Sequence, residues 1–233
     1  MAVTTECTLE VPLAPLRAAL TAVTPHSEPT KTGDDVSEMS RVRLTAAKAE
    51  LLVVACNESG TAALAAVPIE SDSRAERFAA DDGVFSVDIT PGAARLLLRD
   101  FKAGGPGVEA DQDMVKVAFT DTRITVADAS GLLRDSFGLE VSQNTLQFSP
   151  DYPDVTEILG TALARAGEAQ AAKPLVTQGR LWALFRHAAV AYGRPLRVEG
   201  TGGGGPPRVP RPWRAAVLRP RPAGRPHRDP APP

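Results

Sequence analysis

The strongest constraint on the fold of this 233-residue chain is an internal repeat rather than any short motif. Residues 41–69 consist of three apolar segments separated by two short turns, and residues 115–141 follow the same plan. In both copies the second turn ends in Ser-Gly. Apolar residues recur at every second position at Val115, Val117 and Phe119, which is typical of a strand with one buried face. Each copy is therefore expected to form an antiparallel meander of three strands.

A strand and a helix are predicted immediately before each meander. Thr90 followed by Pro91 is a favourable N-cap and first-turn pair for the second helix, which is expected to end at the Gly104-Gly105 pair. The predicted strand and helix are 6–11 and 12–23 before the first meander, and 84–89 and 90–102 before the second. The sequence thus predicts an α+β fold in which two β-α-β-β-β units form one domain over residues 1–146, with antiparallel sheets and helices on one face.

A third unit begins after these two but is only partial. Residues 173–200 contain a predicted helix, capped by Thr177, and the start of a strand at 196–199. Residues 147–172 are interpreted as a connector between the second and third units. Residues 201–233 are rich in Gly, Pro and Arg and are interpreted as a tail.

The overall charge of −2 conceals two unlike parts of the chain. Residues 206–233 contain seven arginines, one aspartate and ten prolines, which gives this segment a charge of +6 and leaves −8 on residues 1–205. The proline content predicts that the tail is disordered. Two interpretations of the tail remain open. It is either a basic low-complexity segment that binds nucleic acid or an SH3-like groove, or an out-of-frame reading of a GC-rich gene that begins near Gly202.

The segment after the second meander reads Phe-Ser-Pro-Asp-Tyr-Pro, residues 148–153. Two β-α-β-β-β units followed by such a segment resemble the bacterial DNA polymerase sliding clamp, the processivity β-subunit, in which Phe-Pro-Asp-Tyr or Phe-Pro-Asn leads from one domain into the next. The resemblance covers about residues 5–200, and one serine is inserted here between the aromatic residue and the proline. Tyr152 is expected to pack back on the finished domain. A clamp subunit has six such units, whereas this chain has two and part of a third.

The resemblance implies a ring of subunits that encloses duplex DNA with its helices and binds polymerase or repair proteins on its outer surface. On that basis a homo-oligomer is expected, and the DNA-binding residues are expected to be Arg17, Arg95, Arg99, Lys102 and Arg186. Arg95, Arg99 and Lys102 are spaced i, i+4 and i+7, which places them on one stripe of a helix and suits contacts to phosphates. A solvated basic surface is the alternative interpretation for each of these residues.

Two other classes of function remain open from the sequence. The chain could keep the clamp fold but act as a regulatory or protein-interaction module that does not encircle DNA. It could also be an unrelated α+β protein that binds a small ligand in an apolar pocket. Neutralising the basic stripe separates the first of these from a DNA-binding clamp, because only DNA association depends on those charges.

The sequence carries no signature of catalysis. It has no G-x-S-x-G, no H-E-x-x-H and no glycine-rich phosphate-binding motif, and its three histidines lie in dissimilar surroundings. We therefore expect a protein that is not an enzyme and that needs no cofactor or metal. No segment is apolar enough for a membrane helix, and the N-terminus lacks a secretory signal, so the expected location is the cytoplasm.

Overall fold

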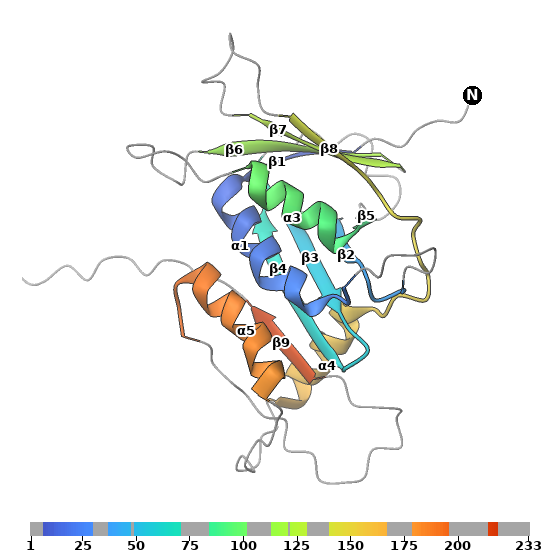
Figure 1. The fold of residues 1–233 in the computed structure, drawn as a ribbon, viewed down its shortest axis with the longest axis vertical. Helices are drawn as coiled ribbons and strands as arrows, with labels where there is room; N and C mark the ends of the chain where they lie inside the picture. The colour runs from blue at the N-terminus through green and yellow to red at the C-terminus, as the bar shows by residue number, and fades with distance from the viewer. Residues whose placement is uncertain are drawn as a thin grey trace, which may run out of the picture.

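The computed structural model describes residues 7–29, 37–47, 49–70, 84–101, 113–120, 122–129, 140–166, 179–195 and 214–218, which form two sheets and several helices (Figure 1). The first unit consists of β1 Cys7–Pro12, α1 Leu13–Val23, a short 3-10 helix Thr24–His26, β2 Val42–Ala47, β3 Glu50–Cys56 and β4 Thr61–Pro68. The second consists of β5 Val84–Ile89, α3 Pro91–Asp100, β6 Met114–Phe119, β7 Arg123–Asp128 and β8 Glu140–Asn144. The predicted α+β fold with two β-α-β-β-β units is confirmed. Strand β8 starts near the end of its predicted segment, and residues 130–139 lie outside the described residues.

The two units exchange their first strands. Strand β1 pairs antiparallel with β6 of the second unit, with Leu9 opposite Val117. Strand β5 pairs in the same way with β2 of the first unit, with Val87 opposite Leu44. The strand orders are therefore β1-β6-β7-β8 and β5-β2-β3-β4-β9. Because each sheet contains strands from both units, neither unit can complete a sheet by itself.

The chain returns to an exchanged strand after each meander. The amide of Glu70 donates a hydrogen bond to the carbonyl of Glu10 at 3.0 Å, and the amide of Leu146 donates to the carbonyl of Asp88 at 2.7 Å. Both acceptors lie three residues before the first residue of a helix. The two bonds thus occupy equivalent places in the two units, which extends the internal repeat from the sequence to the backbone.

Helices α1 and α3 share one apolar core with both sheets. They lie next to each other in Figure 1 and are in contact. Thr90 caps α3 as predicted, because its Oγ1 accepts a hydrogen bond from the amide of Ala93 at 3.0 Å. Helix α3 ends at Asp100, and the glycine pair expected to end it lies outside the described residues. The core is supplied by α1 through Leu13, Leu16, Ala19, Leu20 and Val23, and by α3 through Ala93, Ala94 and Leu97.

Two further helices follow the second unit. Helix α4, Val155–Ala166, lies within the segment interpreted as a connector, and the Asp154 side chain caps it by accepting from the amide of Glu157 at 2.9 Å. Helix α5, Gly179–Tyr192, is the helix predicted for the third unit. Its predicted cap and the strand predicted at 196–199 lie outside the described residues. No helix in the described ranges is long and apolar enough to cross a membrane.

The tail contains a strand, so the prediction that it is disordered is wrong for five residues. Strand β9, Arg214–Leu218, pairs parallel with β4 at the edge of its sheet. These residues are the part of the tail that is free of proline between Pro212 and Pro220. A short segment without proline can donate every backbone N–H to a ladder, and an edge position tolerates prolines on either side of it.

Candidate nucleic-acid interface

Helices α3, α1 and α5 lie side by side and form what we call the helical layer (Figure 1). Helix α1 is central, since it contacts both of the others. Its leucines face the core, whereas half-buried residues, among them Ala14, Arg17 and Thr21, lie on its other side. The helical layer is therefore a surface made from one helix of each repeated unit and from α5.

Positive charge is concentrated in the helical layer. The three helices together carry five arginines and one acidic residue. The eight strands of the two units carry three basic and five acidic side chains. The charged residues of the layer are Arg17, Arg95, Arg99, Asp100, Arg180 and Arg186. A chain whose first 205 residues are acidic thus presents a basic group of helices.

Arg95 and Arg99 are both exposed on α3, one turn apart. The Arg99 side chain is 68% exposed, and it pairs with Asp100 through Nε–Oδ1 at 2.6 Å and Nη2–Oδ2 at 3.1 Å. This hydrogen-bonded pair lowers the pKa of Asp100 and raises the pKa of Arg99. Asp100 therefore offsets part of the charge that Arg99 could present to a phosphate. Lys102, the third residue of the predicted stripe, lies outside the described residues.

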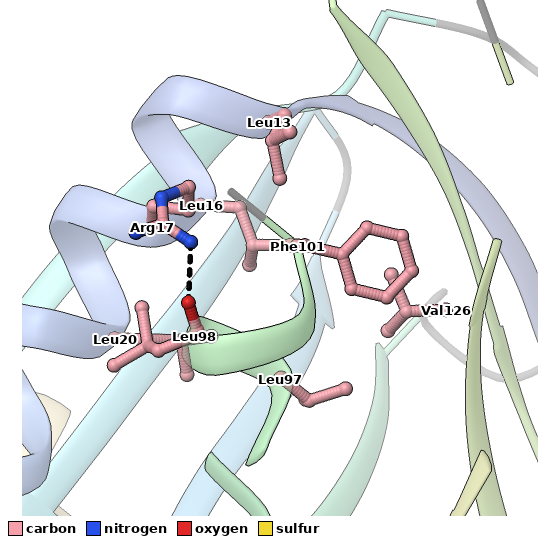
Figure 2. Close-up of a pocket in the computed structure, with 8 residues that line it drawn as sticks. All are labelled: Leu13, Leu16, Arg17, Leu20, Leu97, Leu98, Phe101 and Val126. Atoms are coloured by element: carbon pink, nitrogen blue, oxygen red, sulfur yellow. Dashed lines mark hydrogen bonds between the residues drawn. The ribbon is translucent and has the colours of Figure 1, made fainter. Parts of the chain in front are cut away.

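Arg17 joins α1 to α3, a contact that the sequence did not predict. Its Nη1 donates a hydrogen bond to the Leu98 carbonyl in the last turn of α3 at 2.6 Å (Figure 2). Burial lowers the pKa of the Arg17 guanidinium. The side chain also lines a small apolar cleft between the two helices and β7, together with Leu13, Leu16, Leu20, Leu97, Leu98, Phe101 and Val126. The carbonyl groups at a helix C-terminus favour a cation, so this contact stabilises the end of α3.

Arg17→Met is expected to lower the free energy of unfolding by about 1 kcal/mol, because the Leu98 carbonyl loses a charged donor while methionine keeps the apolar contacts of the cleft. Urea denaturation measures the change. Arg95→Met, an equal change on an exposed residue of the same layer, should cost less than about 0.5 kcal/mol. Equally small effects for both variants would mean that Arg17 contributes nothing between the helices.

Helix α5 packs on the body of the protein through aromatic contacts, and Arg186 is exposed on it. The Phe185 ring lies 4.9 Å from the His26 ring, and the Trp182 ring lies 6.4 Å from that of Phe185. His26 is fully buried, and burial, with a smaller contribution from His187, lowers its pKa to about 4. At neutral pH the imidazole is therefore uncharged and packs against α5 as a neutral ring.

A second group of charged residues is buried outside the helical layer, and it too was missed from the sequence. Asp88 on β5 is fully buried and pairs with Arg41 and Arg43 at the start of β2. The sequence did carry a signal, because two arginines two residues apart point to the same face of a strand. Their partner could not be identified, since pairing of β2 with β5 depends on the exchange of first strands.

Within the described ranges, no group of three His, Cys, Asp or Glu side chains could hold a metal ion. Both cysteines, Cys7 and Cys56, are buried and form no disulfide. Burial raises the pKa of Cys56 to about 11, which leaves the thiol protonated and unreactive at neutral pH. The arginines of the helical layer form the candidate site.

Comparison with known proteins finds similarity in solved structures but not in sequence. No protein-family model matches the chain, and no curated protein matches it. Solved structures similar to it are DNA polymerase sliding clamps. The β-subunit from Streptococcus pyogenes is 14% identical over 73% of this chain and 43% of its own length, with a TM-score of 0.46. The clamp from Bacillus subtilis is 14% identical over 72% of this chain and 40% of its own, with a TM-score of 0.44.

A third similar structure is the Helicobacter pylori β clamp bound to a DNA ligase peptide, which is 12% identical over 64% of this chain and 33% of its own length, with a TM-score of 0.44. The chain thus spans less than half the length of each of these clamps. These structures are members of the family that the sequence resembles. The similarity concerns the fold alone.

Proposed function

We propose that the chain is a non-catalytic, DNA-associating protein of the sliding-clamp kind, which holds duplex DNA along the helical layer and serves as a scaffold for polymerase or repair proteins. One observation carries this proposal, namely the ratio of five arginines to one aspartate on three adjacent helices of an otherwise acidic body. Arginine guanidinium groups bind phosphate oxygens well, and phosphate contacts position a protein on DNA without reading its sequence.

The layer is suited to weak, sequence-independent contact with DNA. Its arginines are scattered over three helices, and Arg99 is partly neutralised by Asp100. Each phosphate contact contributes mainly through counterion release, so a few such contacts give modest, strongly salt-dependent affinity. A protein that retains DNA by enclosing it needs no more than this.

Enclosure of DNA would require more than one copy of the chain. Packed neighbouring helices are 8–10 Å apart, so α3, α1 and α5 together cover roughly 30 Å. A layer of this width can follow one side of a duplex but cannot surround it. We therefore propose a homo-oligomer whose helical layers face the DNA. Native mass in solution, measured with and without circular DNA, tests this, and a monomer indifferent to circular DNA would exclude a ring.

The double variant Arg95→Gln/Arg99→Gln is expected to weaken binding to a short duplex and to reduce the slope of log K against log salt concentration by about 2. The reason is that each lost phosphate contact removes roughly 0.9 from that slope. Fluorescence anisotropy of a labelled duplex at several salt concentrations measures both quantities.

The matched control is Lys116→Gln/Arg123→Gln, which removes two exposed positive charges from β6 and β7. This control changes the net charge equally, so it should leave the slope nearly unchanged if DNA lies along the helical layer. Equal losses for both pairs would show a response to net charge alone, and no loss for either would refute DNA binding by α3.

A second candidate function is a clamp-fold protein-interaction or regulatory module that does not encircle DNA. It is favoured by two observations in the layer: Arg17 already donates to the Leu98 carbonyl, and Arg99 already pairs with Asp100. The first contact occupies a donor of the Arg17 guanidinium, and the second offsets the charge of Arg99, so both arginines are less available to phosphates. Salt-independent or absent DNA association, together with intact folding, would support this function over the first.

A further inference from the structure

The segment Gln147–Tyr152, which we call the joint, is held on the β5-β2-β3-β4-β9 sheet by Asp88 of β5, Arg43 of β2 and Arg41, which directly precedes β2. Arg43 donates to Asp88 through Nε at 2.7 Å and Nη2 at 2.9 Å, and Arg41 donates to Asp88 through Nη1 at 2.9 Å. The same two arginines also bind the backbone of the joint. Arg41 Nη1 donates to the Gln147 carbonyl at 3.1 Å, and Arg43 Nη2 donates to the Ser149 carbonyl at 2.9 Å.

Two aromatic rings also contact Arg43. Its guanidinium carbon lies 4.5 Å from the centre of the Phe148 ring and 4.5 Å from the centre of the Tyr152 ring. Tyr152 is 3% exposed, as expected from the sequence, whereas Phe148 is 54% exposed. Phe148 therefore closes the site from the solvent side. A guanidinium can make such ring contacts while it donates two hydrogen bonds to one carboxylate, which a lysine could not do.

The joint leads into a second apolar cluster that is separate from the main core. Tyr152, Val155 and Leu159 pack there against residues of β3 and β4, which are Val54, Cys56, Ala62 and Leu64. The main core contains other residues of these same strands, together with α1 and α3. Alternate residues of a strand point to opposite faces, so the joint and α4 cover one face of the sheet while α1 covers the other. The joint and the start of α4 can thus separate from the sheet without opening the main core.

We propose that Arg41, Arg43 and Asp88 form a latch that holds the joint and α4 on the sheet, and that Arg43 is its positioning residue. When Arg43 is replaced, the joint and α4 open as one local unit while both sheets stay folded. The contacts of Arg43 explain why its replacement would release the joint. After loss of Arg43, Asp88 still accepts a hydrogen bond from Arg41 at its Oδ2, but its Oδ1, the Ser149 carbonyl and both rings lose their contact with Arg43. The latch is a property of the protein alone and is independent of DNA.

Hydrogen exchange of the full-length protein without DNA, followed by mass spectrometry, tests this inference. Arg43→Met is expected to speed exchange in peptides covering 147–161 by about tenfold or more, with less than about twofold change in β6 and β7. Phe148→Ala removes one ring without burying an unpaired charge, so it should produce the same local pattern at about two- to fivefold. Arg123→Met is the matched control on the other sheet and should leave the joint unchanged.

Two outcomes would overturn the latch. An equal increase of exchange in both sheets and the joint would mean that Arg43 supports the whole fold. No increase at the joint in either Arg43→Met or Phe148→Ala would mean that the arginine contacts do not hold it. Arg43→Lys keeps the charge but cannot make the bidentate and stacked contacts, so it should behave like Arg43→Met, and full protection in this variant would also contradict the proposal.

Discussion

Asp88→Ala is expected to lower the free energy of unfolding by about 3–5 kcal/mol, the cost of removing one partner from a buried ion pair. Asp88 is fully buried, and Arg41 and Arg43 together donate three hydrogen bonds to it. Without the carboxylate, two guanidinium groups remain beside each other with one half-exposed acid, Glu38, as the nearby counter-charge. The variant therefore loses the hydrogen bonds and leaves buried positive charge uncompensated, which is why the effect should exceed that of any surface charge.

Equilibrium urea unfolding at neutral pH measures this loss, and Glu50→Ala is the control. Glu50 is an exposed acid at the start of β3, so its replacement changes the net charge equally but should cost less than about 0.5 kcal/mol. A loss for Asp88→Ala no larger than that for Glu50→Ala would show that the buried cluster contributes little to folding. This measurement reports on the whole fold, whereas hydrogen exchange of the Arg43 variants reports on the joint.

The order of strands and helices in the two repeated units could be predicted from the sequence, but the pairing of the strands could not. Alternation at Val115, Val117 and Phe119 shows that one face of β6 is buried. It does not show which strand lies beside β6, and the structure places β1 of the other unit there. Strand pairing is a long-range property of two segments, whereas period and turn residues are local. The buried Arg43–Asp88 contact was missed for the same reason.

Local signals for α4 were present but were outweighed by Pro150 and Pro153, which precede the helix. Asp154 stands where an N-cap is favoured, and Val155 and Leu159 are spaced i and i+4 as on the apolar side of a helix. Both residues pack on the sheet. The two prolines indicated a connector, but a helix begins two residues after the second of them. The packing of Tyr152 on the finished domain was predicted correctly because an apolar residue at such a turn needs a surface to cover.

The candidate interface could be predicted only in part. Exposure of Arg95 and Arg99 on one side of α3 follows from helical spacing, which the sequence shows directly. The contact between Arg17 and the Leu98 carbonyl depends on the adjacency of α1 and α3, two helices separated by more than sixty residues of chain. Whether any of these arginines binds DNA stays a prediction that the salt-dependence experiment decides.

Acidification is expected to destabilise the protein through His26 by about 3 kcal/mol between pH 6.5 and pH 4. Burial lowers the pKa of His26 from 6.5 to about 4 in the folded protein. Above pH 6.5 the imidazole is neutral in both states and contributes no pH dependence. As the pH falls, the unfolded chain binds a proton that the folded protein does not, so unfolding becomes more favourable until the folded imidazole is also protonated near pH 4.

The His26 contribution must be separated from that of carboxylates, which titrate in part of the same range. The difference in unfolding free energy between the wild type and His26→Leu isolates it, because leucine keeps apolar contact with Phe185 and cannot bind a proton. Relative to His26→Leu, the wild type should lose about 3 kcal/mol of unfolding free energy between pH 6.5 and pH 4. If the difference for His26→Leu does not change with pH, the protonated imidazole must be stabilised in the folded protein by a hydrogen-bond acceptor, and its pKa is not lowered. Because His26 packs against Phe185, loss of α5 contacts, monitored by the fluorescence of Trp182, should accompany the destabilisation.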